Sequence, residues 1–270
     1  MQLRLENGCT IHCSAGNCFL LALGFWVALT VESLAGLKIY YIRHAEAGHN
    51  VKEEWESVRK KDWPSFVGDQ EKFTPRGEIQ RTEAIRKLER YDFDFIAVSP
   101  MWRTRHTILP YLKATKTKAE IWPELHEMYV SSIIVSPDLP KHRGEILGKG
   151  DRIEIPDAEA RYFTLRKDGT REFELPEFKN GHVEKEAETA AARVILQRVA
   201  DMIGERFGSD DSILLVGHGS SGRGLLRFLL HDRLSGYPGI TNAGVWMVEQ
   251  QPDGRFELMI YNDVPLKRNK

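Results

Sequence analysis

The chain has 270 residues, of which 41% are hydrophobic and 29% are charged, as is typical of a soluble globular protein with a full hydrophobic core. Its formal net charge is −1, and no basic stripe interleaved with aromatic residues occurs along it, so nothing favours nucleic acid as a partner. The length permits one large α/β domain or two small ones. The partner that we expect is therefore a small molecule.

The first 35 residues contain the uncharged run FLLALGFWVALTV at 19–31, which is short for a membrane span but typical of a signal-peptide core. Ser33-Leu34-Ala35 then places small residues where a signal peptidase reads them. We therefore expect residues 1–35 to be a signal peptide and the protein to be exported, either periplasmic or secreted. Two alternatives stay open, because Arg4 is the only Lys or Arg before this run. The segment could be an uncleaved membrane anchor, or the start codon could be misassigned and the protein cytoplasmic.

All three cysteines, Cys9, Cys13 and Cys18, precede the apolar run. Only His12 lies near them as a further ligand, so the set that a tetrahedral metal site needs is incomplete. We expect no metal there. If residues 1–35 are removed, no cysteine is left to form a disulfide.

After residue 35, strand-like and helix-like segments alternate through a domain that we place at 36–270. The expected strands are 38–42, 93–100, 120–122 and 211–219, and a hairpin around Pro252-Asp253-Gly254 pairs 244–250 with 255–262. The expected helices are 75–90, 104–112 (with a possible break at Pro110), 184–203 and 222–230. This alternation predicts an α/β three-layer sandwich, in which a mostly parallel central sheet carries helices on both faces.

Residues 128–181 depart from this alternation, being rich in Pro, Gly and mixed charges. A segment of this length is too long for a plain loop, so we interpret it as an inserted cap over a site, with an irregular surface excursion as the alternative. The cap contains basic residues that could select an anionic substrate or could simply be solvated: Lys141, His142, Arg143, Lys149, Arg152, Arg161, Arg166 and Lys167.

Polar residues follow three of the expected strands at the point where each strand ends. Ile42 is followed by RHAEAGHN, Val98 by SPMWRTR, and Val216 by GHG. Because ligands bind beyond the carboxyl ends of parallel strands, we expect these three segments to converge on one site.

In these segments the chain resembles the histidine phosphatase superfamily, also called phosphoglycerate mutase-like. Four motifs carry the resemblance: Arg43-His44-Ala45-Glu46 with Asn50, where alanine replaces the usual glycine; Ser99-Pro100 with Arg103-Thr104 and Thr107; Leu125-x-Glu127; and Gly217-His218. Each motif is weak alone, but the four occur in the family's order from about residue 38 onward. The resemblance implies the family's α/β fold and a phosphoryl-transfer activity.

A phosphate monoester carries nearly two negative charges, and its transfer depends mainly on positioning and charge stabilisation. Arg43 and Arg103 suit this task because a guanidinium matches phosphate oxygens with a fixed fork of donors. Asn50 is expected to add a neutral donor. His218, held close to the phosphate dianion, is expected to favour its protonated form and to act as a further donor. Gly219 leaves the backbone free to approach a ligand closely.

The resemblance implies that His44 is the nucleophile, which forms a phosphohistidine that water then hydrolyses. Glu127 is the expected proton donor to the leaving alkoxide. No cofactor or metal is expected, since no acidic cluster of the kind that magnesium sites use is present. His49 lies inside the first motif and could touch the substrate.

The leading interpretation is therefore a phosphomonoester hydrolase acting on a small-molecule or peptide phosphomonoester. One alternative is phosphoglycerate mutase-like transfer, although Met128-Tyr129-Val130 departs from the segment that follows the acidic motif in mutases. Another is a phosphate- or phosphopeptide-binding relative without turnover. Acid phosphatases of the phytase branch commonly carry His-Asp where this chain has His218-Gly219, which argues against that branch. A membrane partner is expected only if residues 1–35 are an uncleaved anchor.

Overall fold

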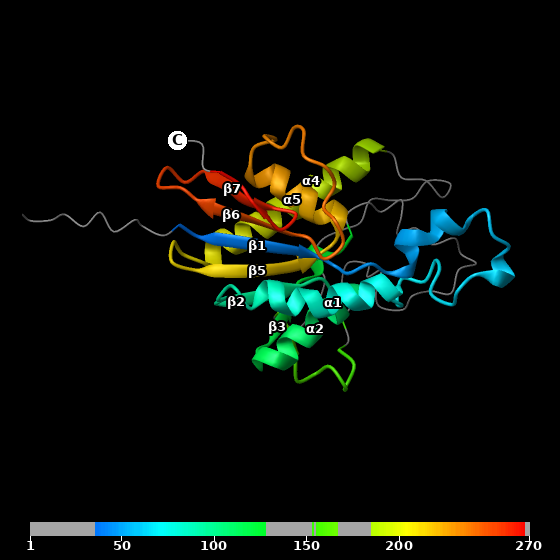
Figure 1. The fold of residues 1–270 in the computed structure, drawn as a ribbon. Coiled ribbons are helices and arrows are strands. Elements are labelled where there is room, and N and C mark those ends of the chain that lie inside the picture. Colours follow the sequence, from blue (N-terminus) through cyan, green and yellow to red (C-terminus); the bar gives the residue numbers. More distant parts are fainter. Residues whose placement is uncertain (1–35, 128–152, 154, 167–184, 268–270) are drawn as a thin grey trace, which may run out of the picture. The chain divides into compact units, whose positions relative to one another are not determined.

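A computed structural model describes residues 36–127, 153, 155–166 and 185–267 (Figure 1). The expected signal peptide at 1–35 and most of the expected cap at 128–181 lie outside these described residues. Within the described part of the chain, none of the helices has the length and apolar character needed to cross a membrane.

An eight-stranded sheet forms the centre of the fold, with the strand order β4-β3-β2-β5-β1-β6-β7-β8. The strands are β1 (Lys38–Arg43), β2 (Phe95–Val98), β3 (Ala119–Ile121), β4 (Phe163–Leu165), β5 (Ser212–Gly217), β6 (Val245–Gln250), β7 (Phe256–Tyr261) and β8 (Val264–Pro265). The strands from β4 to β1 pair in parallel, whereas β6, β7 and β8 add antiparallel pairs. The predicted α/β class with a mostly parallel sheet is confirmed.

Helices cover both faces of this sheet (Figure 1). They are α1 (Pro75–Leu88), α2 (Trp102–Thr115), α4 (Lys185–Arg206) and α5 (Gly219–Leu229). Side chains alternate across a strand, so β1 contributes to two hydrophobic clusters. Tyr41 packs in one cluster with residues of α4 and α5, and Ile42 in the other with residues of α1 and α2. The result is the expected three-layer arrangement.

Helix α2 continues through Pro110, where the sequence suggested a possible break. A proline inside a helix has no N–H to donate to the carbonyl four residues earlier, which here belongs to His106. Arg81 of α1 fills this gap, because its Nε donates to the His106 carbonyl oxygen at 2.8 Å. A tertiary contact that no local pattern reveals therefore keeps the helix intact.

Two helices begin earlier than predicted, and both begin at the carboxyl edge of the sheet. Helix α2 starts at Trp102 rather than 104, shortly after β2, and α5 starts at Gly219 rather than 222, directly after β5. Arg103 and Gly219 consequently lie in first helical turns. The free N–H groups and positive dipole ends of both helices lie at the sheet edge where the polar segments follow the strands, an arrangement that favours anions.

The part of the expected cap that the structure describes includes a strand. Phe163–Leu165 forms β4, which pairs in parallel with β3 at the edge of the sheet. The sequence pattern does not predict a strand at these three residues. Short edge strands are easily missed, because three residues are too few to show an alternating pattern.

Candidate active site

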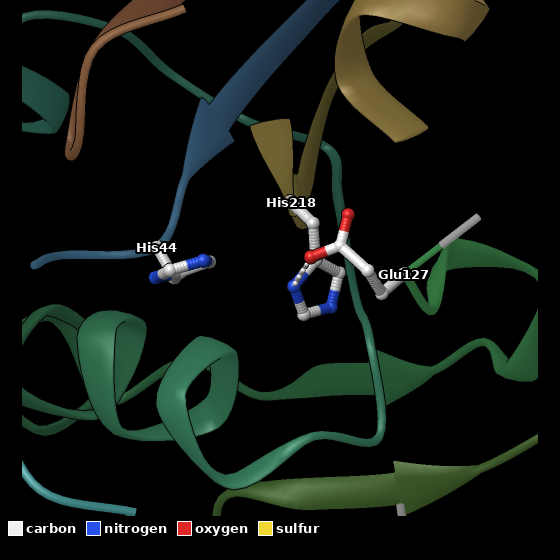
Figure 2. Close-up of side chains that lie close together, drawn as sticks. All are labelled: His44, Glu127 and His218. Atoms are coloured by element: carbon white, nitrogen blue, oxygen red, sulfur yellow. Dashed lines mark ion pairs between the residues drawn. The ribbon is translucent and has the colours of Figure 1, made fainter. Parts of the chain in front are cut away.

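Three side chains from separate strand ends meet at the carboxyl edge of the sheet (Figure 2). His44 follows β1, His218 lies between β5 and α5, and Glu127 follows the 3₁₀ turn Pro123–Leu125 after β3. The ring centroids of His44 and His218 are 5.3 Å apart, and both residues are buried, with exposed fractions of 1% and 0%. The structure thus brings together residues that are up to 174 positions apart along the chain.

His44 is held as a neutral imidazole with a defined tautomer. Its Nδ1 lies 2.7 Å from the Ala45 carbonyl oxygen, which can only accept, so Nδ1 carries the hydrogen and Nε2 keeps its lone pair. Burial lowers the pKa of His44 well below its usual value, and the positive charge of Arg103 lowers it further. The resulting group is a neutral nitrogen nucleophile at the sheet edge.

Ala45 occupies the position at which the family usually has glycine. Its N–H donates to Thr107 Oγ1 at 2.8 Å, and Ala45 is not among the described residues that adopt a positive φ. Its methyl group packs in a small buried cluster with Ala47 and Phe73. The backbone here does not need glycine, which explains why alanine fits.

His218 is fixed from three sides. Its Nε2 lies 2.8 Å from Ser99 Oγ, and its Nδ1 lies 3.3 Å from Glu127 Oε2. The Tyr41 hydroxyl accepts from the His218 N–H at 2.6 Å and contacts the His218 carbonyl oxygen at 2.9 Å. Burial lowers the pKa of His218 to about 4, and Glu127 only partly opposes this effect, so the ring is neutral at pH 7.

Glu127 is ionised in the unliganded protein. Burial alone would raise its pKa, but His218 and the Arg103 guanidinium together lower it to about 2. Arg103 Nη2 lies 3.6 Å from Glu127 Oε2, an ion pair longer than a direct hydrogen bond. Glu127 could therefore donate a proton only after a bound anion has raised its pKa.

The two predicted arginines approach the site from different elements. Arg43 Nη1 donates to the Ile240 carbonyl oxygen at 2.7 Å, while its Nε is buried and has no hydrogen-bond partner among the described residues. Arg103 Nη1 donates to Gln70 Oε1 at 3.0 Å. A side chain at Gly219 would come within 3.2 Å of the Arg43 guanidinium, so glycine leaves room for this arginine. Close guanidinium packing is thus a reason for Gly219, beside the predicted ligand contact.

Asn50 is engaged mainly with protein groups. Its Oδ1 accepts from the Ala47 N–H at 3.0 Å and from Asn242 Nδ2 at 3.3 Å, and its Nδ2 lies 3.1 Å from His49 Nε2. Asn242 Nδ2 also lies 3.2 Å from the His44 carbonyl oxygen. Asn50 therefore lies within the site, where its predicted role as a phosphate donor stays a prediction.

The donor atoms of His44, Glu127 and His218 all lie within 4.8 Å of one another, and these residue types can bind transition metals. Arg43 and Arg103, however, bring two permanent positive charges to the same place, where Glu127 opposes them most strongly and Glu46 acts more weakly on Arg43. With neutral histidines, the cluster carries a local positive charge. The arrangement therefore suits an anion better than a divalent cation.

Sequence reasoning missed three residues that shape the site. Tyr41 lies in an apolar strand, where a tyrosine is expected to belong to the hydrophobic core. Gln70 and Asn242 lie in loops outside all four motifs. Only the structure shows that they contact His218, Arg103 and Asn50, respectively.

Comparisons with known proteins agree with this geometry. The family model "Histidine phosphatase superfamily (branch 1)" matches residues 39–133, which include Arg43, His44, Arg103 and Glu127. No curated protein sequence matches the chain.

Among solved structures, a mycobacterial glucosyl-3-phosphoglycerate phosphatase superposes with a TM-score of 0.50 at 17% identity, covering 84% of this chain and 99% of its own. A candidate α-ribazole-5'-P phosphatase from Escherichia coli does so with a TM-score of 0.50 at 16% identity, covering 87% and 100%. At these identities the likeness concerns the fold. Residues 39–133 therefore match the histidine phosphatase superfamily, and the described fold is similar to that of solved phosphatases.

Proposed function

We propose that the protein is a phosphomonoester hydrolase that transfers the phosphoryl group of its substrate to His44. One observation carries this proposal: Nε2 of a buried, neutral His44 is freed for attack because Nδ1 is held by the Ala45 carbonyl oxygen. Arg43 and Arg103 supply the positive charge that would hold a phosphate in front of it. The match of residues 39–133 to the histidine phosphatase superfamily supports phosphoryl transfer as the general chemistry.

In the first step, His44 Nε2 attacks phosphorus and a P–N bond forms as the bond from phosphorus to the ester oxygen breaks. The leaving alkoxide takes a proton from Glu127. Glu127 is ionised in the unliganded protein, so it must first take up a proton from solvent. The negative charge of the bound phosphate raises its pKa and makes this possible.

In the second step, water attacks the phosphohistidine on the side opposite His44. Glu127, now ionised again, accepts a proton from this water as the P–N bond breaks. Inorganic phosphate is released, and His44 returns to its neutral form. Arg43 and Arg103 hold the transferring group throughout, since its charge persists in both steps.

The test compares the full chain with a His44→Ala variant on p-nitrophenyl phosphate. We expect kcat/KM to fall by about 10³-fold or more, because removing the nucleophile eliminates the covalent route. A His231→Ala variant, which changes an exposed histidine, is the matched control. Equal rates for wild type and His44→Ala would overturn the proposal. With a phosphoglycerate as substrate, release of inorganic phosphate, rather than of an isomeric monoester, separates hydrolysis from mutase chemistry.

The covalent intermediate has its own test. Rapid quenching during turnover, followed by peptide mass spectrometry, should find a phosphate on His44 that is stable in base and lost in acid. Absence of this adduct in an active enzyme would point to direct attack by water on the substrate.

The natural substrate is proposed to be a small-molecule or peptide phosphomonoester, and export through residues 1–35 is proposed with it. A panel of phosphorylated sugars, nucleotides and peptides tests the first proposal. Sequencing the N-terminus of the protein purified from its native cell tests the second, since an export signal predicts that the chain begins after Ala35.

A further inference from the structure

His49 lies beside the nucleophile on a tightly held backbone. It is the second residue of the 3₁₀ turn η1 (Gly48–Trp55), and its ring centroid lies 5.6 Å from that of His44. The His49 N–H donates to the Asp69 carbonyl oxygen at 3.2 Å, and the Gly48 N–H to the Lys72 carbonyl oxygen at 2.9 Å. The turn therefore gives His49 a fixed position in the site.

The orientation of the Asn50 amide decides the tautomer of His49. Asn50 Oδ1 accepts from the Ala47 backbone N–H, which can only donate, so the oxygen must point toward Ala47. The Asn50 NH₂ group then points toward His49 and donates to its Nε2 at 3.1 Å. Since Nε2 is the acceptor in a neutral imidazole, the hydrogen of His49 must reside on Nδ1.

This Nδ1–H group is shielded from solvent and has no hydrogen-bond partner among the described residues. Burial lowers the pKa of His49 to about 3, with Arg103 adding to the effect, so the ring stays neutral at working pH. A buried donor without a partner is unfavourable. In native proteins such a donor is commonly explained by a water, an ion or a ligand that binds to it.

We propose that the Nδ1–H of His49 donates a hydrogen bond to an oxygen of the phosphate group bound at His44, and that Asn50 holds His49 in the tautomer that makes this possible. The inference rests on the proposed function, since it places the phosphate in front of His44. Asn50 then acts through His49. The donor adds a directed contact without adding positive charge to a site that already holds two arginines.

Two substitutions of His49 separate donation from packing. His49→Phe keeps an aromatic ring of similar shape but removes the donor, whereas His49→Gln keeps a donor on a flexible side chain. We expect His49→Phe to lower kcat/KM for p-nitrophenyl phosphate by about 10- to 100-fold, as loss of a single donor to the transferring group would do. His49→Gln should stay within about fivefold of wild type, because its amide keeps a neutral donor that can reach the phosphate.

Binding of inorganic phosphate, measured by calorimetry on the same proteins, tests the inference without catalysis. We expect His49→Phe to raise the Kd by about tenfold and His49→Gln to raise it by less, again from the loss of one neutral hydrogen bond. His231→Phe, at an exposed position, is the matched control and should bind phosphate as wild type does. Melting temperatures of all variants show whether each one folds.

The tautomer is observable directly by ¹⁵N NMR of the imidazole rings, with His49 assigned by its absence from the His49→Gln spectrum. We expect hydrogen on Nδ1 in wild type and loss of this preference in Asn50→Ala. An Nε2–H tautomer in wild type would overturn the inference.

The outcomes distinguish this inference from the proposed function. If wild type hydrolyses p-nitrophenyl phosphate and folded His49→Phe matches it in kcat/KM and in phosphate affinity, the His49 inference fails while the hydrolase proposal stands. If wild type shows no turnover but binds phosphate in a His49-dependent way, the hydrolase proposal fails and the inference about binding stands.

Discussion

Helix α2 contributes basic side chains to two clusters of buried charge that differ in how tightly their charges are paired. The site cluster contains Arg103 with Glu127 and His218, and the two ion pairs described within it are long, at 3.6 Å and 3.3 Å. The anchor cluster contains Arg105 and His106 with Glu159, and its contacts are short, at 2.8 Å and 3.0 Å.

This difference in ion-pair length distinguishes a ligand-binding site from a structural ion pair. In the anchor cluster, Glu159 accepts from Arg105 with one oxygen and contacts His106 with the other, so both carboxylate oxygens are engaged. Buried charges are tolerated when they are satisfied in this way. In the site cluster, long ion pairs lie next to the Nδ1 of His49, which has no hydrogen-bond partner among the described residues, and an entering anion could accept from these donors.

The largest effect expected from this comparison is on catalysis. Arg103→Ala should lower kcat/KM for p-nitrophenyl phosphate by about 10³-fold, because it removes charged donors from the transferring phosphate. Arg105→Ala, two positions away on the same helix, is the matched control and should lower it far less while lowering the melting temperature more. Steady-state kinetics and thermal unfolding of both variants check the prediction. A larger loss of activity in Arg105→Ala would reverse the roles assigned to the two clusters.

The second effect is on stability. Glu159→Gln should lower the free energy of unfolding at pH 7 by about 3 kcal/mol, since it leaves the buried Arg105 guanidinium without a countercharge. For a domain of this size, such a loss corresponds to a drop of about 6 to 12 °C in the melting temperature. Differential scanning calorimetry measures it, and Asp157→Asn, an exposed acidic residue nearby, is the control.

The same variant has a pH dependence with a defined sign. Burial alone would raise the pKa of Glu159, but His106 and Arg105 lower it from 4.5 to about 2. A carboxyl whose folded pKa is lowered contributes stability above its unfolded pKa and loses this contribution as the pH falls toward the folded value. The difference between wild type and Glu159→Gln should therefore be full at pH 7 and shrink between about pH 4.5 and pH 2. A difference that grows on acidification would contradict the pairing.

Much of the candidate active site could be predicted from sequence, whereas the anchor cluster could not. Arg43, His44 and His218 stand at strand ends, where strand–helix alternation predicts convergence. Arg105 and Glu159 lie 54 residues apart, and Glu159 belongs to a segment without any periodic pattern. Which ring nitrogen of His49 carries the hydrogen depends on the orientation of the Asn50 amide, and this orientation is known only from the structure. The α/β class and the edge of the sheet that holds the site follow from local patterns, but strand order and side-chain partners depend on tertiary contacts.

The third effect is on the pH profile of kcat/KM, in which the loss of activity on the acid side should begin at a lower pH than for an ordinary histidine. Attack requires neutral His44, and burial, followed by Arg103, lowers its pKa well below the usual 6.5. A histidine of this kind stays neutral until the pH falls to its folded pKa. We expect kcat/KM, corrected for ionisation of the ester with its second pKa of about 6, to show no loss between pH 7 and about pH 5. A limb with a midpoint near 6.5 would show that the nucleophile is not shielded as described.

The smallest effect concerns the backbone carbonyl group of His106, a residue of the anchor cluster. Arg81 donates to the His106 carbonyl oxygen that Pro110 leaves without a helical partner, so Arg81→Met should cost about 1 kcal/mol of stability. In a Pro110→Ala background the residue 110 N–H can take over this carbonyl, and Arg81→Met should then cost less. Chemical denaturation of the four proteins gives the coupling energy directly. If the two costs are equal, the continuity of α2 through Pro110 does not depend on Arg81, and the helix tolerates the proline for another reason.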